Sequence, residues 1–176
     1  MIIGKDVKVN KDIFLKRKDQ ITIGNRVAID KGFYCTSALN IGDYVHISPY
    51  VTCIGGKGKS QLIAKGFNNI MAGARIICGS DRFDDSGIPG TLIPKEYKGR
   101  EIVKDVVLEA FSNVGTNAII MPGSVLRKGA LLTAGSLLIG DTVPWGVYKG
   151  NPAKLVKTIN GEKIIENARL IGYEFE

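Results

Sequence analysis

The chain contains a single histidine, His46, whose imidazole is of the kind that can do acid–base chemistry. It directly precedes Ile47, an aliphatic residue expected to point inward, so the imidazole is expected to project outward near a corner of the fold. An imidazole titrates near neutral pH and can take a proton from an attacking hydroxyl or amine. His46 is therefore a candidate general base. The alternative is a solvent-facing histidine without a chemical role.

A second candidate is the carboxylate-rich segment 79–85, Gly-Ser-Asp-Arg-Phe-Asp-Asp. Its first carboxylate, Asp81, is of the type that orients an imidazole by accepting a hydrogen bond from it. Aspartates also favour turns and loop caps, so a structural role for Asp81, Asp84 and Asp85 is the alternative.

A repeat of six residues must position these side chains, and it is clearest between residues 108 and 138. Each unit opens with an aliphatic residue and carries a small residue four places later. The openers are Leu108, Val114, Ile120, Leu126, Leu132 and Leu138, and the small residues are Ser112, Ala118, Ser124, Ala130 and Ser136. A period of six matches neither an α-helix nor simple strand alternation. It predicts a parallel β-helix built from hexapeptides, three to a coil.

The same period runs through the N-terminal half, with a slip at residues 18–20 and a short loop at residues 55–60. The openers there are Ile3, Val9, Leu15, Ile23, Ile29, Cys35, Ile41, Ile47, Cys53, Ala64, Ile70 and Ile76. Cys35 and Cys53 are one coil apart, so we expect them to stack in the core as small hydrophobic residues.

The repeat has one long interruption, at residues 79–103, and is followed by a tail. Residues 79–103 show no period and predict a protruding loop with a binding or covering function. The chain is expected to turn out of the prism at residues 140–146, and a short helix between Gly161 and Gly172 is expected to cap an end. We therefore predict one all-β domain over residues 1–176, with coils at about 3–78 and 104–139, a loop at about 79–103 and a tail at 140–176.

Counting hexads from Ile23 gives the relative positions of the two candidates. His46 ends the fourth hexad and Asp81 ends the ninth, and because three hexads make one coil, the two residues belong to different corners of the prism. They should not meet within one chain. In a trimer of prisms packed side by side, Asp81 of one copy can face His46 of the next.

The composition of the chain indicates which classes of ligand it binds and in which compartment it works. The 176 residues carry a formal net charge of +7, which favours anionic ligands such as phosphorylated cofactors or nucleotide-sugars, although a solvated basic surface is the alternative. The N-terminal residues do not resemble a signal peptide, no apolar run approaches spanning length, and the three cysteines suggest a reducing, cytoplasmic compartment.

Several kinds of site are not expected. One histidine per chain does not build a three-histidine zinc site, so we predict no metal. The chain has no glycine-rich phosphate loop of Walker or Rossmann type, and it lacks the interleaved aromatic and basic residues of a nucleic-acid interface.

The segment 144–154, Pro-Trp-Gly-Val-Tyr-Lys-Gly-Asn-Pro-Ala-Lys, follows the last hexad. With the hexads and the long loop, it makes the chain resemble the hexapeptide-repeat acyltransferases, most closely the sugar O-acetyltransferases of the galactoside and maltose acetyltransferase type. The resemblance covers nearly the whole chain. It implies a left-handed parallel β-helix and a homotrimer with active sites between subunits. It also implies that acetyl-CoA, as co-substrate, lies in the groove between adjacent prisms.

The resemblance also implies roles for individual residues. The residues implied in acetyl-CoA binding are Asn113, Thr116, Ala134, Gly135, Ser136, Trp145, Lys149 and Lys154, the two lysines near its phosphates. The residues implied in acceptor binding are Ser48, Ser80, Arg82, Phe83 and Asp84.

At one position the chain differs from the galactoside acetyltransferases in a way that affects catalysis. The galactoside enzymes have their catalytic histidine at the start of the long loop, where this chain has Asp81. We therefore hypothesise that His46 is the base and that Asp81 orients it across the subunit interface, with substrate-assisted catalysis as the alternative. The predicted function is acetyl transfer from acetyl-CoA to a sugar hydroxyl, in surface polysaccharide biosynthesis. The alternatives are N-acetyl transfer to a nucleotide-linked amino sugar and a non-catalytic scaffold.

Overall fold

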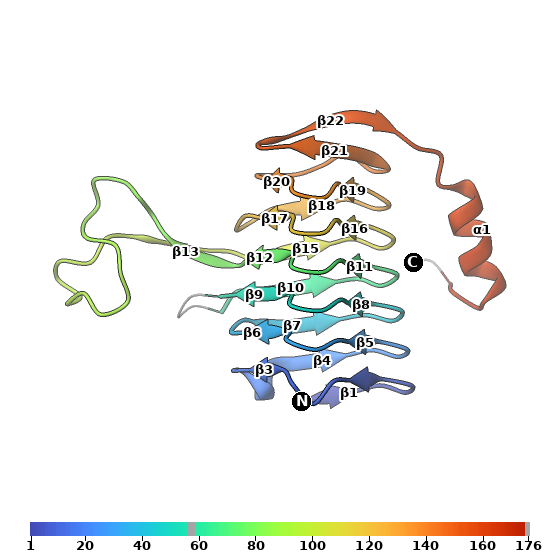
Figure 1. Cartoon of the computed structure of the whole chain (residues 1–176), viewed down its shortest axis with the longest axis horizontal. Coiled ribbons are helices and arrows are strands. Elements are labelled where there is room, and N and C mark those ends of the chain that lie inside the picture. Colours follow the sequence, from blue (N-terminus) through green and yellow to red (C-terminus); the bar gives the residue numbers. More distant parts are fainter. Residues whose placement is uncertain (56–58, 175–176) are drawn as a thin grey trace.

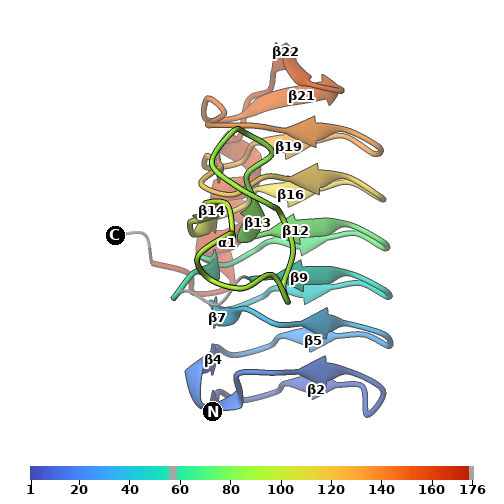
Figure 2. The ribbon, with the colours of Figure 1, turned by 90° about the vertical axis from the view of Figure 1, so that its left-hand side faces the viewer.

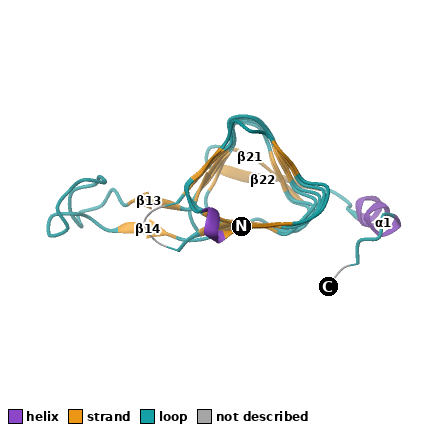
Figure 3. Cartoon of the chain, turned by 90° about the horizontal axis from the view of Figure 1, so that it is seen from below, coloured by secondary structure: helices purple, strands orange, loops and turns teal. Residues whose placement is uncertain are grey.

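The computed structural model describes residues 1–55 and 59–174, so part of the short loop predicted at residues 55–60 lies outside the described residues. Short parallel strands stack on three faces around a triangular core (Figures 1 and 3). Sheet A contains β1 (Ile2–Ile3), β4 (Ile21–Ile23), β7 (Ala38–Ile41), β10 (Gln61–Ala64), β15 (Val106–Leu108) and β18 (Val125–Leu126). Sheet B contains β2 (Lys8–Val9), β5 (Ala28–Ile29), β8 (His46–Ile47), β11 (Asn69–Ile70), β16 (Asn113–Val114), β19 (Leu131–Leu132), β21 (Gly146–Gly150) and β22 (Ala153–Thr158). Sheet C contains β3 (Phe14–Leu15), β6 (Tyr34–Cys35), β9 (Thr52–Ile54), β12 (Arg75–Ile77), β17 (Ile119–Ile120) and β20 (Leu137–Leu138).

The predicted openers fill the core. Every opener from Ile23 to Leu138 is at most 2% exposed, which confirms the phase of the repeat across both interruptions. The openers of the first coil are more exposed because no coil lies below them. Cys35 pairs in register with Cys53, as predicted. Hydrogen bonding with Cys35 and Cys78, and then burial, raises the pKa of the Cys53 thiol well above its ordinary value, so this thiol is unreactive.

The slip at residues 18–20 is a short 3₁₀ helix, η1 (Lys18–Gln20). The prediction that the chain leaves the prism at residues 140–146 is wrong. Instead, β21 pairs in parallel with β19, and β22 folds back antiparallel to β21 (Figure 1). Tyr148, in register with Leu132, takes the inward position and covers the end of the core. The sequence analysis did not predict β21 for two reasons. Its inward residue, Tyr148, is aromatic and not aliphatic, and the connection from β20 is longer than one hexad.

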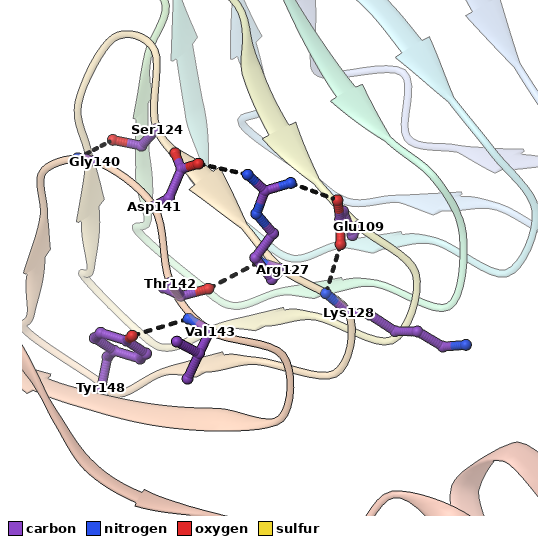
Figure 4. A network of polar contacts seen from close by, with 9 residues as sticks. All are labelled: Glu109, Ser124, Arg127, Lys128, Gly140, Asp141, Thr142, Val143 and Tyr148. Carbon is purple, nitrogen blue, oxygen red and sulfur yellow. Dashed lines mark hydrogen bonds and ion pairs between the residues drawn. The ribbon is translucent and has the colours of Figure 1, made fainter.

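A polar network fastens the segment that leads into β21 (Figure 4). The guanidinium of Arg127 donates to Glu109 Oε1 at 3.1 Å and to Asp141 Oδ2 at 2.6 Å. Hydrogen bonding to Asp141 first, and then to Glu109, raises the pKa of Arg127. The backbone amide of Arg127 donates to the hydroxyl of Thr142 at 2.8 Å. These contacts hold residues 141 and 142 over the last strand of sheet A.

Two appendages leave the prism at different corners (Figures 1, 2 and 3). Residues 79–103, here named the arm, leave between sheets C and A, and β13 (Gly79–Asp81) and β14 (Glu101–Val103) form an antiparallel ladder at its base. The predicted C-terminal helix is confirmed as α1 (Glu162–Leu170). However, α1 lies beside the corner between sheets A and B rather than across an end of the prism. No helix in residues 1–55 or 59–174 is long and apolar enough to cross a membrane.

The corner between sheets A and B carries a ladder of aromatic rings. Tyr44 stacks on Phe67 at 4.5 Å between centroids, and Phe67 packs on Phe111 at 4.9 Å. All three residues have a left-handed backbone, with φ of 56°, 54° and 66°. This conformation costs a residue with a side chain about 1–3 kcal/mol, which the stacking offsets in part. Tyr173, beyond α1, packs edge-on against Phe67 at 4.7 Å and ties the C-terminal segment to this corner.

Candidate active site

His46 is the first residue of β8, directly after the corner between sheets A and B. Its side chain is 45% exposed, as expected for an outward position. The imidazole Nε2 lies 2.8 Å from Oδ2 of Asp30, which follows β5 on the coil below. Because an ionised carboxylate only accepts hydrogen bonds, Nε2 carries the proton of a neutral imidazole and Nδ1 keeps its lone pair. This is the arrangement of a general base held by a carboxylate.

His46 belongs to a polar row on the outer face of sheet B. Asn69 on β11 and Asn113 on β16 occupy the next two places in the same register. The amide Nδ2 of Asn113 donates to the carbonyl of Phe111 at 2.8 Å, which fixes the orientation of that side chain. The row therefore places one imidazole and two amides on three successive coils, at a spacing of about 4.8 Å.

A cavity of about 520 Å³ opens over this row. The aromatic ladder forms one wall, and α1 forms the roof. The residues around it are Tyr44, His46, Phe67, Asn68, Asn69, Phe111, Asn113, Ile164, Asn167, Ala168 and Ile171. A cavity of this size, mainly apolar with a few converging polar groups, is typical of a small-molecule site.

The wall of the cavity is fixed by a buried amide. Asn68 is 2% exposed, and its Oδ1 accepts from the backbone amide of Gly66 at 3.0 Å. Its Nδ2 donates to the carbonyls of Glu109 at 2.8 Å and Ser112 at 3.0 Å. These bonds join the coils of β11 and β16, which carry Phe67 and Phe111, so they hold the aromatic wall in place.

Asp81 does not contact His46 within the chain, as the hexad count predicted. It lies in β13 at the base of the arm, at the opposite edge of sheet A, where its carboxylate is 3.8 Å from Nζ of Lys98. The carboxylate that contacts His46 is Asp30, which the sequence analysis missed. The sequence did contain a signal for this contact. Asp30 directly follows the opener Ile29, one coil below His46, so its carboxylate could have been placed on the same outer face.

The residues predicted to bind the acceptor fall into two groups. Ser48 follows β8 and lies two residues beyond His46, on the same face of the prism. Ser80, Arg82, Phe83 and Asp84 lie on the arm, away from the cavity. Arg82 pairs with Asp84 at 2.9 Å, and Phe83 is 86% exposed. The role of all five in acceptor binding remains a prediction.

The residues predicted to bind acetyl-CoA are also spread over several places. Asn113 lines the His46 cavity. The residues at the corner between sheets B and C are Thr116, Ala134 and Gly135. Ser136 is buried, and its hydroxyl accepts from the backbone amide of Gly150 at 3.0 Å, so it attaches the end of β21. Lys149 and Lys154 lie directly opposite each other on β21 and β22, both side chains away from the core.

Trp145, the remaining residue predicted at the cofactor, lies close to the start of α1. A Cβ atom added at Gly129 or at Gly161 would overlap the Trp145 ring, so the ring lies against both glycines. Gly161 is the residue that precedes α1. Trp145 thus anchors the beginning of the helix that roofs the cavity, and its contact with a cofactor remains a prediction.

No model of a protein family matches the sequence. The chain is 26% identical over 173 residues to the dTDP-4-amino-4,6-dideoxy-D-glucose acyltransferase of Escherichia coli, covering 93% of this chain and 84% of that protein. It is 29% identical over 139 residues to a probable macrolide acetyltransferase of Lysinibacillus sphaericus, covering 70% and 72%. The crystal structure of AntD, an N-acyltransferase from Bacillus cereus in complex with dTDP and 3-hydroxybutyryl-CoA, matches with a TM-score of 0.88 at 26% identity, over 96% of this chain and 88% of that one.

These relatives support the resemblance at its coarser level. The predicted fold, a left-handed parallel β-helix, and the predicted enzyme class, an acyltransferase, are confirmed. The finer prediction of the galactoside and maltose O-acetyltransferase type is not specifically supported. The relatives named for amino sugars and N-acyl transfer favour the alternative acceptor, an amine, over the sugar hydroxyl.

Proposed function

We propose that this chain transfers an acyl group from an acyl-CoA to the amino group of a nucleotide-linked amino sugar. The observation that carries the proposal is the His46–Asp30 pair at the edge of a cavity lined by amides and aromatic rings. The Escherichia coli relative is named for a dTDP-linked amino sugar, and the AntD structure contains dTDP and an acyl-CoA. Both ligands are consistent with the net charge of +7 of this chain.

In the proposed reaction His46 acts at its Nδ1 atom, because Asp30 holds the opposite nitrogen. Nδ1 takes one proton from the ammonium group of the acceptor, which frees the nitrogen lone pair. The amine attacks the thioester carbonyl carbon, a carbon–nitrogen bond forms and the carbon–sulfur bond breaks. The departing thiolate takes the proton that the nitrogen loses as the amide forms. The proton held by His46 passes to water.

The placement of the arm supports a trimer as part of this proposal. The arm leaves at one edge of sheet A and His46 lies at the other edge. If sheet A faces a threefold axis, the arm of each copy lies beside the His46 corner of the next. Ile63, Val107 and Val125 form a half-buried, β-branched row in register on the outer face of sheet A and suit such an interface. In this assembly Asp81 at the base of the arm lies near the His46 corner of the neighbouring copy.

Two lysines support phosphate binding at the C-terminal end of the prism. Lys149 and Lys154 face each other across β21 and β22, and like charges at directly opposite positions destabilise a strand pair. A bound phosphate removes that repulsion. We therefore propose that these lysines bind phosphates of the acyl-CoA, as the resemblance implies.

The test is a thiol-release assay with acetyl-CoA and 3-hydroxybutyryl-CoA against two matched sets of acceptors. One set contains dTDP-linked amino sugars, and the other contains the same sugars with a hydroxyl in place of the amine. We expect turnover with the amines and a product whose mass and alkaline stability identify an amide. If only the hydroxyl set reacts and the products are esters, the acceptor group is a hydroxyl and not an amine. Absence of acyl-CoA binding would overturn the proposal.

A further inference from the structure

Asn69 holds a polar group that the fold itself does not satisfy. Its Oδ1 atom is buried and has no hydrogen-bond partner among residues 1–55 and 59–174. Such an atom loses its hydrogen bonds to water without replacement, so it destabilises the folded chain. A leucine of similar size would not carry this penalty. A polar side chain that lowers the stability of the fold and lies at a cavity is therefore a candidate for a functional role.

The position of Asn69 supplies the second observation. It lies in register between His46 on the coil below and Asn113 on the coil above, and all three residues line the cavity. One hydrogen of Asn113 Nδ2 is donated to the carbonyl of Phe111, which leaves its Oδ1 and its second Nδ2 hydrogen for a ligand. The terminal torsion of an asparagine is soft, so a ligand donor can turn the amide oxygen of Asn69 toward the cavity. The row then presents hydrogen-bonding groups to a ligand from each of the two coils above His46.

The chemistry of the cavity narrows the ligand. Within the described chain, no lysine, arginine, aspartate or glutamate lines it, so it does not suit the phosphates of a nucleotide or of CoA. The rings of Phe67 and Phe111 form an apolar wall. Ile164 of α1 and Ile171, which directly follows the helix, form an apolar roof. An uncharged ring with apolar faces and polar substituents at its edge suits these surfaces, which is the description of a pyranose.

We infer that the cavity is the subsite for the pyranose ring of the acceptor and that Asn69, together with Asn113, determines which ring substituents are accepted. The inference rests on the proposed function and deepens it. The two amides bind substituents that neighbour the reacting group, while His46 takes the proton from that group. The phosphates of both substrates then lie outside the cavity.

The test compares Asn69→Leu with the wild type in steady-state acyl transfer. We expect the KM for the amino-sugar acceptor to rise tenfold or more, the KM for acyl-CoA to stay within twofold, and the Tm to stay equal or rise. A purely structural residue would not combine an unchanged or higher Tm with this selective loss. Thr52→Val, which exchanges an outward polar residue on sheet C, is the matched control and should leave both KM values unchanged.

The outcomes separate this inference from the proposed function. A wild type without acyl transfer to any acceptor means that the proposed function is wrong. Transfer by the wild type with an unchanged acceptor KM in Asn69→Leu, or with a rise in the KM for acyl-CoA instead, overturns the inference alone. Should Asn69→Leu not fold, Asn69→Ser gives the same comparison with a smaller side chain. A lowered Tm without a change in acceptor KM in that variant would make Asn69 a structural residue.

Discussion

Asp30 Oδ2 and His46 Nε2 lie 2.8 Å apart and belong to adjacent coils, so the stacking of the β-helix itself sets their distance. The two side chains are 42% and 45% exposed, so the pair is open to a ligand. An exposed polar contact of this kind adds little stability. Its significance is that it orients the imidazole and directs Nδ1 away from Asp30.

Replacing the base should remove most of the activity. We expect His46→Gln to lower kcat by about 10²- to 10⁴-fold, the range that a positioned general base contributes. Both KM values should change little, because the glutamine keeps the approximate size of the side chain. Ser48→Ala, two residues along the same strand end, is the control and should lose far less. A fully active His46→Gln would point to substrate-assisted catalysis.

Replacing the carboxylate should have a smaller effect of the same kind. We expect Asp30→Asn to lower kcat by about 10- to 100-fold with both KM values unchanged, because an amide holds the imidazole without favouring its charged form. Steady-state kinetics for both substrates measure this split. Asp81→Asn tested alongside distinguishes the two carboxylates. A loss confined to Asp81→Asn would make the residue on the arm, rather than Asp30, the partner of His46.

The repeat can be tested with two adjacent isoleucines on β17. Ile120 is fully buried, whereas Ile119 is 36% exposed on the outer face. We expect Ile120→Asp to lower the free energy of unfolding by about 4 kcal/mol or more, because it buries an unpaired carboxylate. Ile119→Asp should change it by at most about 1 kcal/mol. Denaturant unfolding of both variants measures this difference. Equal losses of unfolding free energy would contradict the assigned phase of the repeat.

The hexad phase was predictable because each opener reports the geometry of its own unit, whatever the neighbouring coil does. Counting hexads therefore placed His46 and Asp81 at different corners, as the structure confirms. Asp30 could not be chosen in the same way. Its contact with His46 depends on which outward side chains of adjacent coils meet, and outward positions carry no hydrophobic signal.

The position of α1 was unpredictable for a related reason. The amphipathic pattern after Gly161 predicted a helix, but nothing in the pattern says which surface it covers. The direction is set by the Trp145 ring, which lies against Gly129 and Gly161, and by Tyr173, which packs on the aromatic ladder. Both contacts join residues far apart in the chain. The cavity over His46 exists only once they have formed.

The base of the arm should loosen at low pH. The hydroxyl and backbone amide of Ser86, and then Arg100 and Arg82, hold the pKa of Asp84 below its ordinary value of 3.8. The folded arm therefore binds this proton more weakly than the unfolded arm does, so the stabilisation is present above the ordinary pKa and lost as pH falls through the folded value. Hydrogen exchange of residues 79–103, corrected for intrinsic rates, should increase over that window. Asp84→Asn should show the faster exchange already at pH 7, and Asp85→Asn should not.

The roof of the cavity should depend on Gly161. A Cβ at this position would overlap the Trp145 ring, although the φ of −93° suits any residue, so Gly161→Ala tests the packing and not the backbone. We expect the substitution to displace the start of α1, to increase hydrogen exchange in residues 162–170 and to raise the acceptor KM several-fold. The coils should stay folded, because Trp145 lies outside the stack of openers. If α1 moves and the acceptor KM does not change, the helix is no part of the acceptor site and the pyranose must bind elsewhere on sheet B.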